Sequence, residues 1–315
     1  MVEGWSYFDK IPNLFQAFFS ILDACKSVPR RTGPYRILRY AGFTILTDPN
    51  FLHRGDHVHL GYGMTAVRRT NPALELEALP SIDFVLLSHM HEDHFDREVE
   101  RKLDHNLPIV TTPHAAADLV SKGFRAAKAL NTWEPLTVTK GGARVRIRAM
   151  PGAHASGVIA RMLPPVMGSL LEFENSRGDV AFRTYITGDT VFFDELKQIP
   201  RQFPDIDLAL LHLGGTMFFG VLMVTMDPKQ GVEVIRLVKP KTAIPIHYDD
   251  YSAFESALGD TAHAPTADPP EWWQRTQIKS FEEFIAAAKE ASPSSEVRIL
   301  RRGETYTFSV PESRR

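Results

Sequence analysis

The stretch His89-Met90-His91-Glu92-Asp93-His94 is the densest group of potential metal ligands in this chain. Three further polar residues arrive singly: His154 in Pro-Gly-Ala-His, Asp189 in Thr-Gly-Asp-Thr, and His247 in Pro-Ile-His-Tyr. Imidazole nitrogens and carboxylate oxygens are the ligands that zinc and related divalent ions prefer. Each group follows an apolar run that predicts a strand. The sequence therefore places all of them at strand ends, where a rigid scaffold presents catalytic groups.

The runs around these groups predict an α/β fold. Ile82–Leu87 is a short continuous apolar run, typical of a strand buried on both faces. Tyr35–Thr47 predicts a hairpin turning at Gly42, and Val145–Met150 alternates with period two before His154. Further predictions are strands at Leu170–Glu174, Val180–Thr187, Asp207–Leu213 and Ala243–Ile246, helices at Asp96–Leu103, Ala115–Lys122, Pro228–Leu237 and Phe281–Ala291, a hairpin at Val297–Phe308 turning at Gly303, and a loop over residues 50–80.

The strands fall into two halves, each with helices, which predicts two sheets packed face to face with helices outside. We expect a single domain over residues 1–315, with an N-terminal apolar segment at about 1–34 and a C-terminal extension at about 251–315. The stretch Gly259–Pro270 is a loop candidate rather than a domain boundary.

The segment Ile11–Leu22 is strongly apolar but too short to span a bilayer, so no transmembrane span is expected. We favour a helix packed on the domain or on a second subunit, which allows a homo-oligomer. The alternative is an interfacial anchor with weak membrane-surface association, although few basic residues flank it.

Composition limits the class of protein. The 315 residues are 43% apolar and 23% charged, as in a soluble globular protein. A formal net charge of −2 gives no nucleic-acid footprint, because a backbone-binding surface normally carries a basic excess. The single cysteine, Cys25, cannot form an internal disulfide, and the N-terminus lacks the positive start of a secretory signal. We therefore expect a cytoplasmic protein.

The spacing of the polar residues favours two ions rather than one. In an extended turn His89 and His91 can point to one ion, leaving Asp93 and His94 for a second. His154 can complete the first set and His247 the second, with Asp189 bridging. Two divalent ions, two aspartates and a bridging hydroxide leave roughly one positive charge, which suits an anionic substrate or transition state.

These residues resemble the metallo-β-lactamase superfamily over roughly residues 35–250. The resemblance implies a four-layer αββα sandwich of two mixed sheets, with two divalent ions at the sheet edges. It assigns His89, His91 and His154 to one ion, Asp93, His94 and His247 to the other, and Asp189 to the bridge. Zn²⁺ is the leading choice, and Mn²⁺ or Fe would suit almost the same ligands.

A narrower resemblance rests on two stretches. Leu79-Pro80-Ser81-Ile82-Asp83 running into Ser88-His89 is similar to the branch that includes ascorbate-6-phosphate lactonases and the phospholipase D that cleaves N-acylphosphatidylethanolamine. Thr47-Asp48-Pro49 resembles its early Asp-Pro element, which implies that Asp48 lies beside the metal site.

The chain also departs from the pattern of the family that it resembles. His212 stands where that branch often has proline, and it could contact substrate or support the ligands; we favour support. No cysteine ligand lies near Asp189, which argues against a true β-lactamase. Position 91 is not the glutamate of diiron oxidoreductases. The 57 residues between Asp189 and His247 are too few for the inserted domain of nucleic-acid-processing members.

Two other features have competing interpretations. His53, His57 and His59 look superficially like a metal cluster, but we expect a surface or substrate-loop role, because seven ligands already satisfy two ions. The apolar run Met217–Met226 is interpreted as core or a dimer contact, or else as an apolar wall over the metals that would favour an acyl or lipid-like substrate.

The sequence therefore predicts a dinuclear metal-dependent hydrolase in which a metal-bridging hydroxide cleaves an ester-like bond, phosphodiester or lactone. Asp93 is the expected proton relay to the leaving group. The partner is expected to be a small-molecule or lipid-like anionic substrate, not nucleic acid. The alternative is an iron-dependent redox enzyme of the thiol dioxygenase type on the same fold.

Overall fold

Two sheets packed face to face form the centre of the structure, a computed structural model that describes residues 18–22, 35–61, 64–155, 163–175, 177–218, 222–251 and 281–310. The first sheet has the strand order β18 (Thr305–Ser309), β1 (Phe18–Leu22), β2 (Arg36–Tyr40), β3 (Phe43–Thr47), β6 (Phe84–Leu86), β7 (Ile109–Thr111) and β8 (Ala127–Ala129). The second has the order β17 (Glu296–Val297), β16 (Thr242–Ile246), β13 (Leu208–His212), β12 (Val180–Ile186), β11 (Gly168–Glu174), β10 (Ala143–Met150) and β9 (Pro135–Lys140).

The first sheet starts from the predicted hairpin, which is confirmed. β2 and β3 pair antiparallel with Tyr40 opposite Phe43. The turn between them holds Ala41 at φ 45° and Gly42 at φ 88°, and two successive positive φ values are the backbone that a tight two-residue hairpin needs. From β3 onward the pairing with β6, β7 and β8 is parallel. The ends of β3 and β6 therefore point to the same edge.

The second sheet is antiparallel from β9 to β12 and parallel from β12 through β13 and β16 to β17. The register sets Thr184 opposite Leu208 and Leu208 opposite Thr242. Because these strands run the same way, β12, β13 and β16 deliver the residues after their carboxyl ends to one edge of the sheet.

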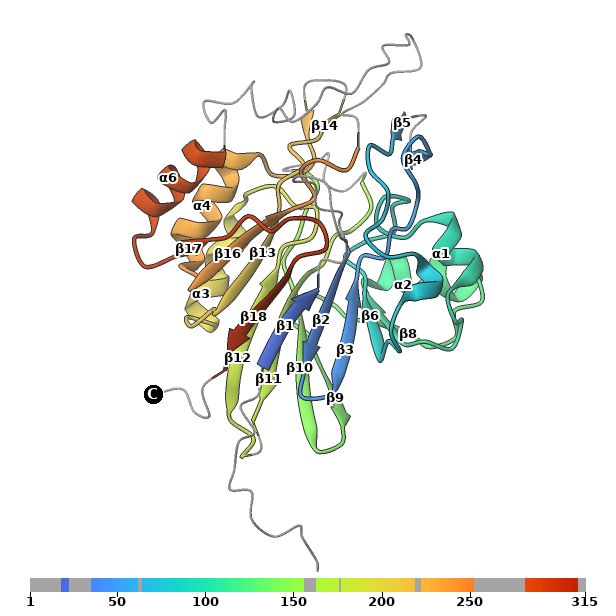
Figure 1. Ribbon diagram of the computed structural model, residues 1–315, viewed down its shortest axis with the longest axis horizontal. Coiled ribbons are helices and arrows are strands. Elements are labelled where there is room, and N and C mark those ends of the chain that lie inside the picture. The colour runs from blue at the N-terminus through green and yellow to red at the C-terminus, as the bar shows by residue number, and fades with distance from the viewer. Residues whose placement is uncertain are drawn as a thin grey trace, which may run out of the picture.

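Helices cover the outer face of each sheet, as predicted (Figure 1). α1 (Arg97–Lys102) and α2 (Pro113–Ser121) lie on one side, and α3 (Ile199–Gln202), α4 (Pro228–Val238) and α6 (Phe281–Ala291) lie on the other. Between the sheets, buried side chains of both, such as Phe43 and Phe173, form one apolar cluster. Separate apolar clusters lie under each helical layer. The four-layer αββα sandwich is confirmed.

Local sequence explains where the helices begin. The Asp96 carboxylate accepts the Glu98 and Val99 N–H groups at the start of α1. Thr112 caps α2 before Pro113, and Asp227 caps α4 before Pro228. A capping oxygen followed by proline satisfies or removes the N–H groups that lack a partner in the first turn.

Three sequence predictions need correction. Phe18–Leu22, part of the segment predicted as a helix, is a strand between β2 and β18. The rest of that segment, residues 11–17, and the predicted loop at 259–270 lie outside the described residues. A short apolar run has no period that separates strand from helix, and here the sheet supplies partners. Residues 50–80 contain a hairpin, β4 (His57–Gly61) with β5 (Met64–Val67).

The predicted hairpin over Val297–Phe308 is wrong, because its two arms join different sheets. β17 pairs parallel with β16, whereas β18 pairs antiparallel with β1. The extension at about 251–315 therefore contributes an edge strand to each sheet. No described helix is long and apolar enough to cross a membrane.

Candidate metal centre

All the predicted ligands come after the carboxyl ends of strands, at the open edge between the two sheets. The 89–94 loop follows β6 in the first sheet, with residues 87–88 between them. The others come from the second sheet: His154 after β10, Asp189 after β12 and His247 directly after β16. The structure brings the seven residues together in two adjacent groups.

His89, His91 and His154 form the first group. His89 Nε2 lies 2.9 Å from His91 Nδ1. The His154 ring lies 4.6 Å from the ring of His89, between centroids, and its Nδ1 donates to the Val224 carbonyl at 3.1 Å. That hydrogen bond leaves His154 Nε2 as the nitrogen with a lone pair for a metal. The ligand nitrogens of these three rings all lie within 4.8 Å of one another, so the three histidines can share one cation.

Asp93, His94, Asp189 and His247 form the second group. The Asp189 Oδ2 atom lies 3.4 Å from His94 Nε2 and 3.5 Å from His247 Nε2. Asp93 Oδ2 lies 3.5 Å from His247 Nε2 and 3.8 Å from His94 Nε2. Ligands about 2.0–2.1 Å from a tetrahedral zinc lie about 3.3 Å from one another. The spacing of this group fits a cation better than it fits direct hydrogen bonds.

Unpartnered buried atoms support the same interpretation. Among the described residues, Asp93 Oδ1, His94 Nε2, His154 Nε2 and Asp189 Oδ1 are buried and have no hydrogen-bonding partner. Buried polar atoms are normally paired, because losing water without a replacement costs roughly 1–3 kcal/mol each. These four atoms lie together in the predicted site, although other buried atoms without a partner occur elsewhere in the described chain. The donor set therefore fits divalent cations.

The electrostatics differ between the groups. Burial lowers the pKa of His91 to about 4 and the pKa of His89 well below its usual range, so these imidazoles are neutral. Burial would also lower the pKa of His94, but Asp189, Asp93 and Asp48 outweigh it and raise that pKa to about 10. The carboxylates therefore stabilise positive charge at the second group. A bound cation can supply that charge in place of a proton.

Backbone strain is concentrated at the same place. Asp48 and His247 adopt left-handed backbone, at φ 38° and φ 55°. Such conformations cost of order 1–3 kcal/mol in non-glycine residues and persist where the surroundings impose them, often at functional sites. Gly188, at φ 63°, lies so close to the ligand loop that a Cβ there would meet the Ser88 Cβ at 3.0 Å.

The two residues predicted beside the ligands are both at this edge. Asp48 Oδ1 accepts the Ser88 N–H at 2.7 Å and lies 3.5 Å from His94 Nδ1. His212 ends β13 and is fully buried. Together with His94 they form a third cluster of ligand-type atoms.

Sequence reasoning missed two supporting residues. The Thr225 hydroxyl donates to Asp189 Oδ2 at 2.9 Å, and the Asp250 carboxylate lies 3.0 Å from His247 Nδ1. Their positions were the only signal in the sequence. Thr225 is a polar residue at the end of the apolar Met217–Met226 run, and Asp250 lies three positions after His247. That run forms a hairpin, β14 (Met217–Phe218) with β15 (Leu222–Met223), whose next residues support the ligands.

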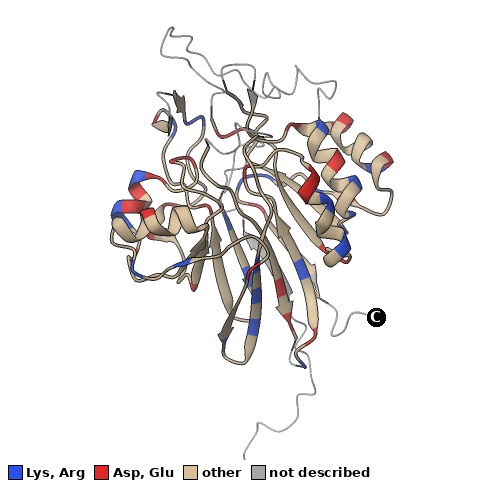
Figure 2. Cartoon of the chain, turned by 180° about the vertical axis from the view of Figure 1, so that it is seen from behind, with Lys and Arg blue, Asp and Glu red and all other residues tan. Residues whose placement is uncertain are grey.

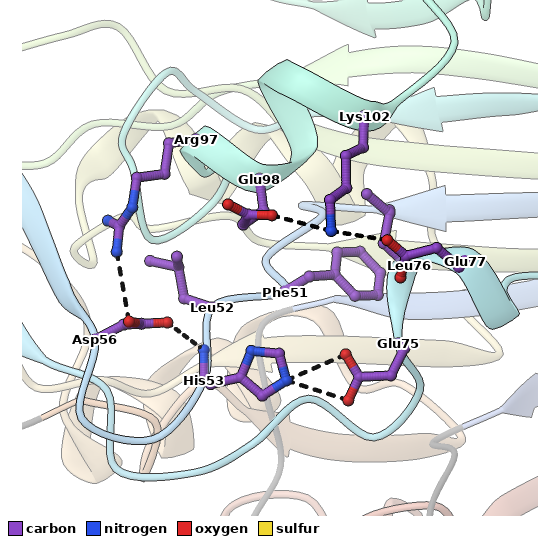
Figure 3. Close-up of a pocket in the computed structure, with 10 residues that line it drawn as sticks. All are labelled: Phe51, Leu52, His53, Asp56, Glu75, Leu76, Glu77, Arg97, Glu98 and Lys102. Carbon is purple, nitrogen blue, oxygen red and sulfur yellow. Dashed lines mark hydrogen bonds and ion pairs between the residues drawn. The ribbon is translucent and has the colours of Figure 1, made fainter.

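The three histidines of the 53–59 stretch lie on the surface, as predicted. His53 pairs with Glu75 at 3.1 Å, and His59 pairs with Glu92 at 3.0 Å. His53 lines a hollow of about 190 Å³, together with Phe51 and Leu52 (Figure 3). Its charged side chains face one another, as in the pair Lys102–Glu77 at 2.7 Å. None of the seven predicted ligands lines this hollow.

Known proteins share both the fold and parts of the sequence. A family model described as the beta-lactamase superfamily domain matches residues 44–248. A UPF0173 metal-dependent hydrolase of Nanoarchaeum equitans is 26% identical over 213 residues, covering 67% of this chain and 85% of that protein.

Two solved structures show the same fold. An isothiocyanate hydrolase from Delia radicum gut bacteria has a TM-score of 0.66 at 18% identity, covering 90% of this chain and 99% of the other. A diiron β-hydroxylase from Streptomyces venezuelae has a TM-score of 0.62 at 13% identity, covering 95% of this chain and 55% of the other.

The match to the family model, the αββα sandwich and the clustered metal ligands together define a metal-dependent hydrolase of the metallo-β-lactamase fold. The chain belongs to the metallo-β-lactamase superfamily.

Proposed function

We propose that the chain is a dinuclear hydrolase that cleaves an ester-like bond, phosphodiester or lactone, in a small-molecule or lipid-like anionic substrate. The observation that carries the proposal is the pair of adjacent ligand groups with Asp189 beside both. Asp189 Oδ2 lies among the nitrogens of the second group, and Oδ1 has no partner within the described chain. The same carboxylate acts electrostatically on His89, His91 and His154 in the first group.

The residues of the two groups would hold one divalent cation each. When bound, the two cations would supply activation of a water nucleophile and stabilisation of a developing oxyanion. Asp93 contributes a buried carboxylate, with Oδ1 unpartnered among the described atoms. That atom can hold a proton and pass it to the leaving group, which is the role proposed for Asp93.

The surface of the chain supports a small substrate rather than nucleic acid. Figure 2 shows acidic and basic residues mixed over the outer helices, in keeping with the formal net charge of −2. The half-buried Met217 and Met223 lie opposite each other in the hairpin that leads into Val224 and Thr225. Because these two residues contact His154 and Asp189, the methionines support an apolar wall beside the metals. An acyl or lipid-like group would pack against such a wall. Both a lactonase and a phospholipase are compatible with this proposal.

The experiment measures metal content per chain by elemental analysis, with hydrolysis of bis(p-nitrophenyl) phosphate and of a simple lactone on the same sample. Two zinc or manganese ions with turnover of either substrate would support the proposal. His91→Ala and Asp189→Ala should lose metal and activity while circular dichroism stays close to that of the wild type. His114→Ala, which changes an exposed histidine outside the groups, is the matched control.

An iron-dependent redox enzyme is the rival, because the same fold occurs in the diiron β-hydroxylase. Iron in the isolated chain, oxygen consumption and no hydrolysis would replace the proposal with that alternative. Full activity in Asp189→Ala would refute the assignment of the site.

A further inference from the structure

His212 is a buried histidine at this edge that neither ligand group uses. It ends β13 and has no exposed surface, so it cannot touch a substrate. Its ring lies 5.8 Å from the ring of His94, nearly parallel at 28°. Its Nε2 points to Asp48 Oδ2 at 3.5 Å and has no hydrogen-bonding partner within the described chain.

Thr187 favours one position for the proton of His212. The Thr187 Oγ1 atom accepts the backbone N–H of His212 at 3.0 Å and lies 3.2 Å from its Nδ1. Because that oxygen already accepts one hydrogen bond, its own proton can point to Nδ1. A neutral ring that accepts at Nδ1 carries its proton on Nε2, which faces Asp48.

Asp48 transmits this contact to a metal ligand. One of its oxygens faces His212, while the other accepts the Ser88 N–H at 2.7 Å and lies 3.5 Å from His94 Nδ1. The Asp48 carboxylate therefore lies between the two rings, on a residue with left-handed backbone. Asp48 can therefore accept a hydrogen bond from each ring. A proton on His94 Nδ1 leaves His94 Nε2 with its lone pair toward Asp189 and Asp93.

We propose that His212 is a positioning residue which, through Asp48, fixes the orientation and tautomer of His94 and so sets the metal affinity of the second group alone. The inference rests on the proposed dinuclear site and deepens it. The two ligand rings beside His212 are those of His94 and His247, both 5.8 Å away between centroids and both members of the second group. The two metal positions should therefore respond differently to a change at position 212.

The same three residues have an alternative use as a third cation site, since Asp48, His94 and His212 also form a cluster of ligand-type atoms. That use would place His94 between two cations, one at each ring nitrogen. We favour positioning because Asp48 Oδ1 already accepts an N–H group and Thr187 already orients the ring of His212. The number of ions bound separates the two interpretations.

The test titrates Zn²⁺ into the full-length chain against a chromophoric chelator, resolving the two binding steps. His212→Phe keeps the ring and removes the donor, while His212→Gln keeps a donor that can reach Asp48. In His212→Phe one step should weaken about 10–100-fold and the other stay close to wild type, as expected when a group that orients one metal ligand is lost. Co²⁺ spectra of the singly loaded variant should show which group remains: histidines alone, or histidines with carboxylates.

Thr187→Val, with Thr187→Ser as its control, tests the same chain of contacts without changing His212, in case His212→Phe does not fold. Selective loss of the second group in His212→Phe or Thr187→Val, with Gln and Ser near wild type, supports the inference. Equal weakening of both steps, no weakening, or three zinc ions in the wild type overturns it. Wild type that binds no zinc, manganese or iron would instead sink the proposed function, and this inference with it.

Discussion

Thr225 offers a test of how strongly the surroundings of the ligands control the site. Its side chain is buried, and its hydroxyl donates to Asp189 Oδ2 at 2.9 Å. Valine has nearly the same shape, so Thr225→Val opens no cavity and removes only the donor. The carboxylate then loses one of the contacts that fix its orientation.

The size of the effect comes from the chemistry of that bond. A hydrogen bond to a charged group contributes about 1.5–3 kcal/mol. Each 1.4 kcal/mol is a factor of ten, so the range corresponds to a loss of about 10–150-fold. Because Asp189 acts on the histidines of both groups, both zinc-binding steps should weaken, unlike the selective effect expected at position 212.

The assay is zinc affinity by chelator competition, with turnover of bis(p-nitrophenyl) phosphate on the same samples. Thr225→Ser keeps the hydroxyl and should stay close to wild type. Thr184→Val is the matched control, since Thr184 is buried and its hydroxyl has no hydrogen-bonding partner within the described chain. Wild-type affinity and turnover in Thr225→Val would refute the reasoning.

Four other changes test different parts of the structure. Asp96→Ala should lower the free energy of unfolding by about 3–5 kcal/mol, because it removes a helix cap and leaves two buried N–H groups of residues 51–52 unpaired. Urea unfolding measures this loss, and a loss under about 1 kcal/mol would contradict the prediction. Asp250→Ala should weaken zinc binding about 10–100-fold by freeing the His247 ring, and unchanged zinc affinity would refute this. Gly188→Ala should cost about 1–3 kcal/mol, since its Cβ would meet Ser88, so a Tm equal to wild type rules the clash out. The raised pKa of His94, about 10, means that protons compete with metal below that pH, so zinc affinity should rise from about pH 6 to pH 9 in a chelator titration; a fall would contradict the sign.

Most of the site could be predicted because its signals are local. The ligands stand just after apolar runs whose length and period identify strands, and parallel strands bring the residues after their carboxyl ends to one edge. Thr225 and Asp250 could not be predicted, because their roles depend on contacts made across the folded chain. Some predictions of the fold were wrong for the same reason. Phe18–Leu22 is a strand only because β2 and β18 lie on either side of it, and β18 comes from the far end of the sequence.

The two ligand groups draw on both halves of the sandwich. Positions 89–94 belong to the first sheet, and positions 154, 189 and 247 belong to the second. A cation held between them would tie together points far apart in the chain, and closing a long loop restricts the unfolded chain most. A chain with one cysteine has no internal disulfide to do this. Bound metal would take the place of such a cross-link and, unlike a disulfide, could dissociate. The concentration of free metal would then set the stability of the folded protein as well as its activity.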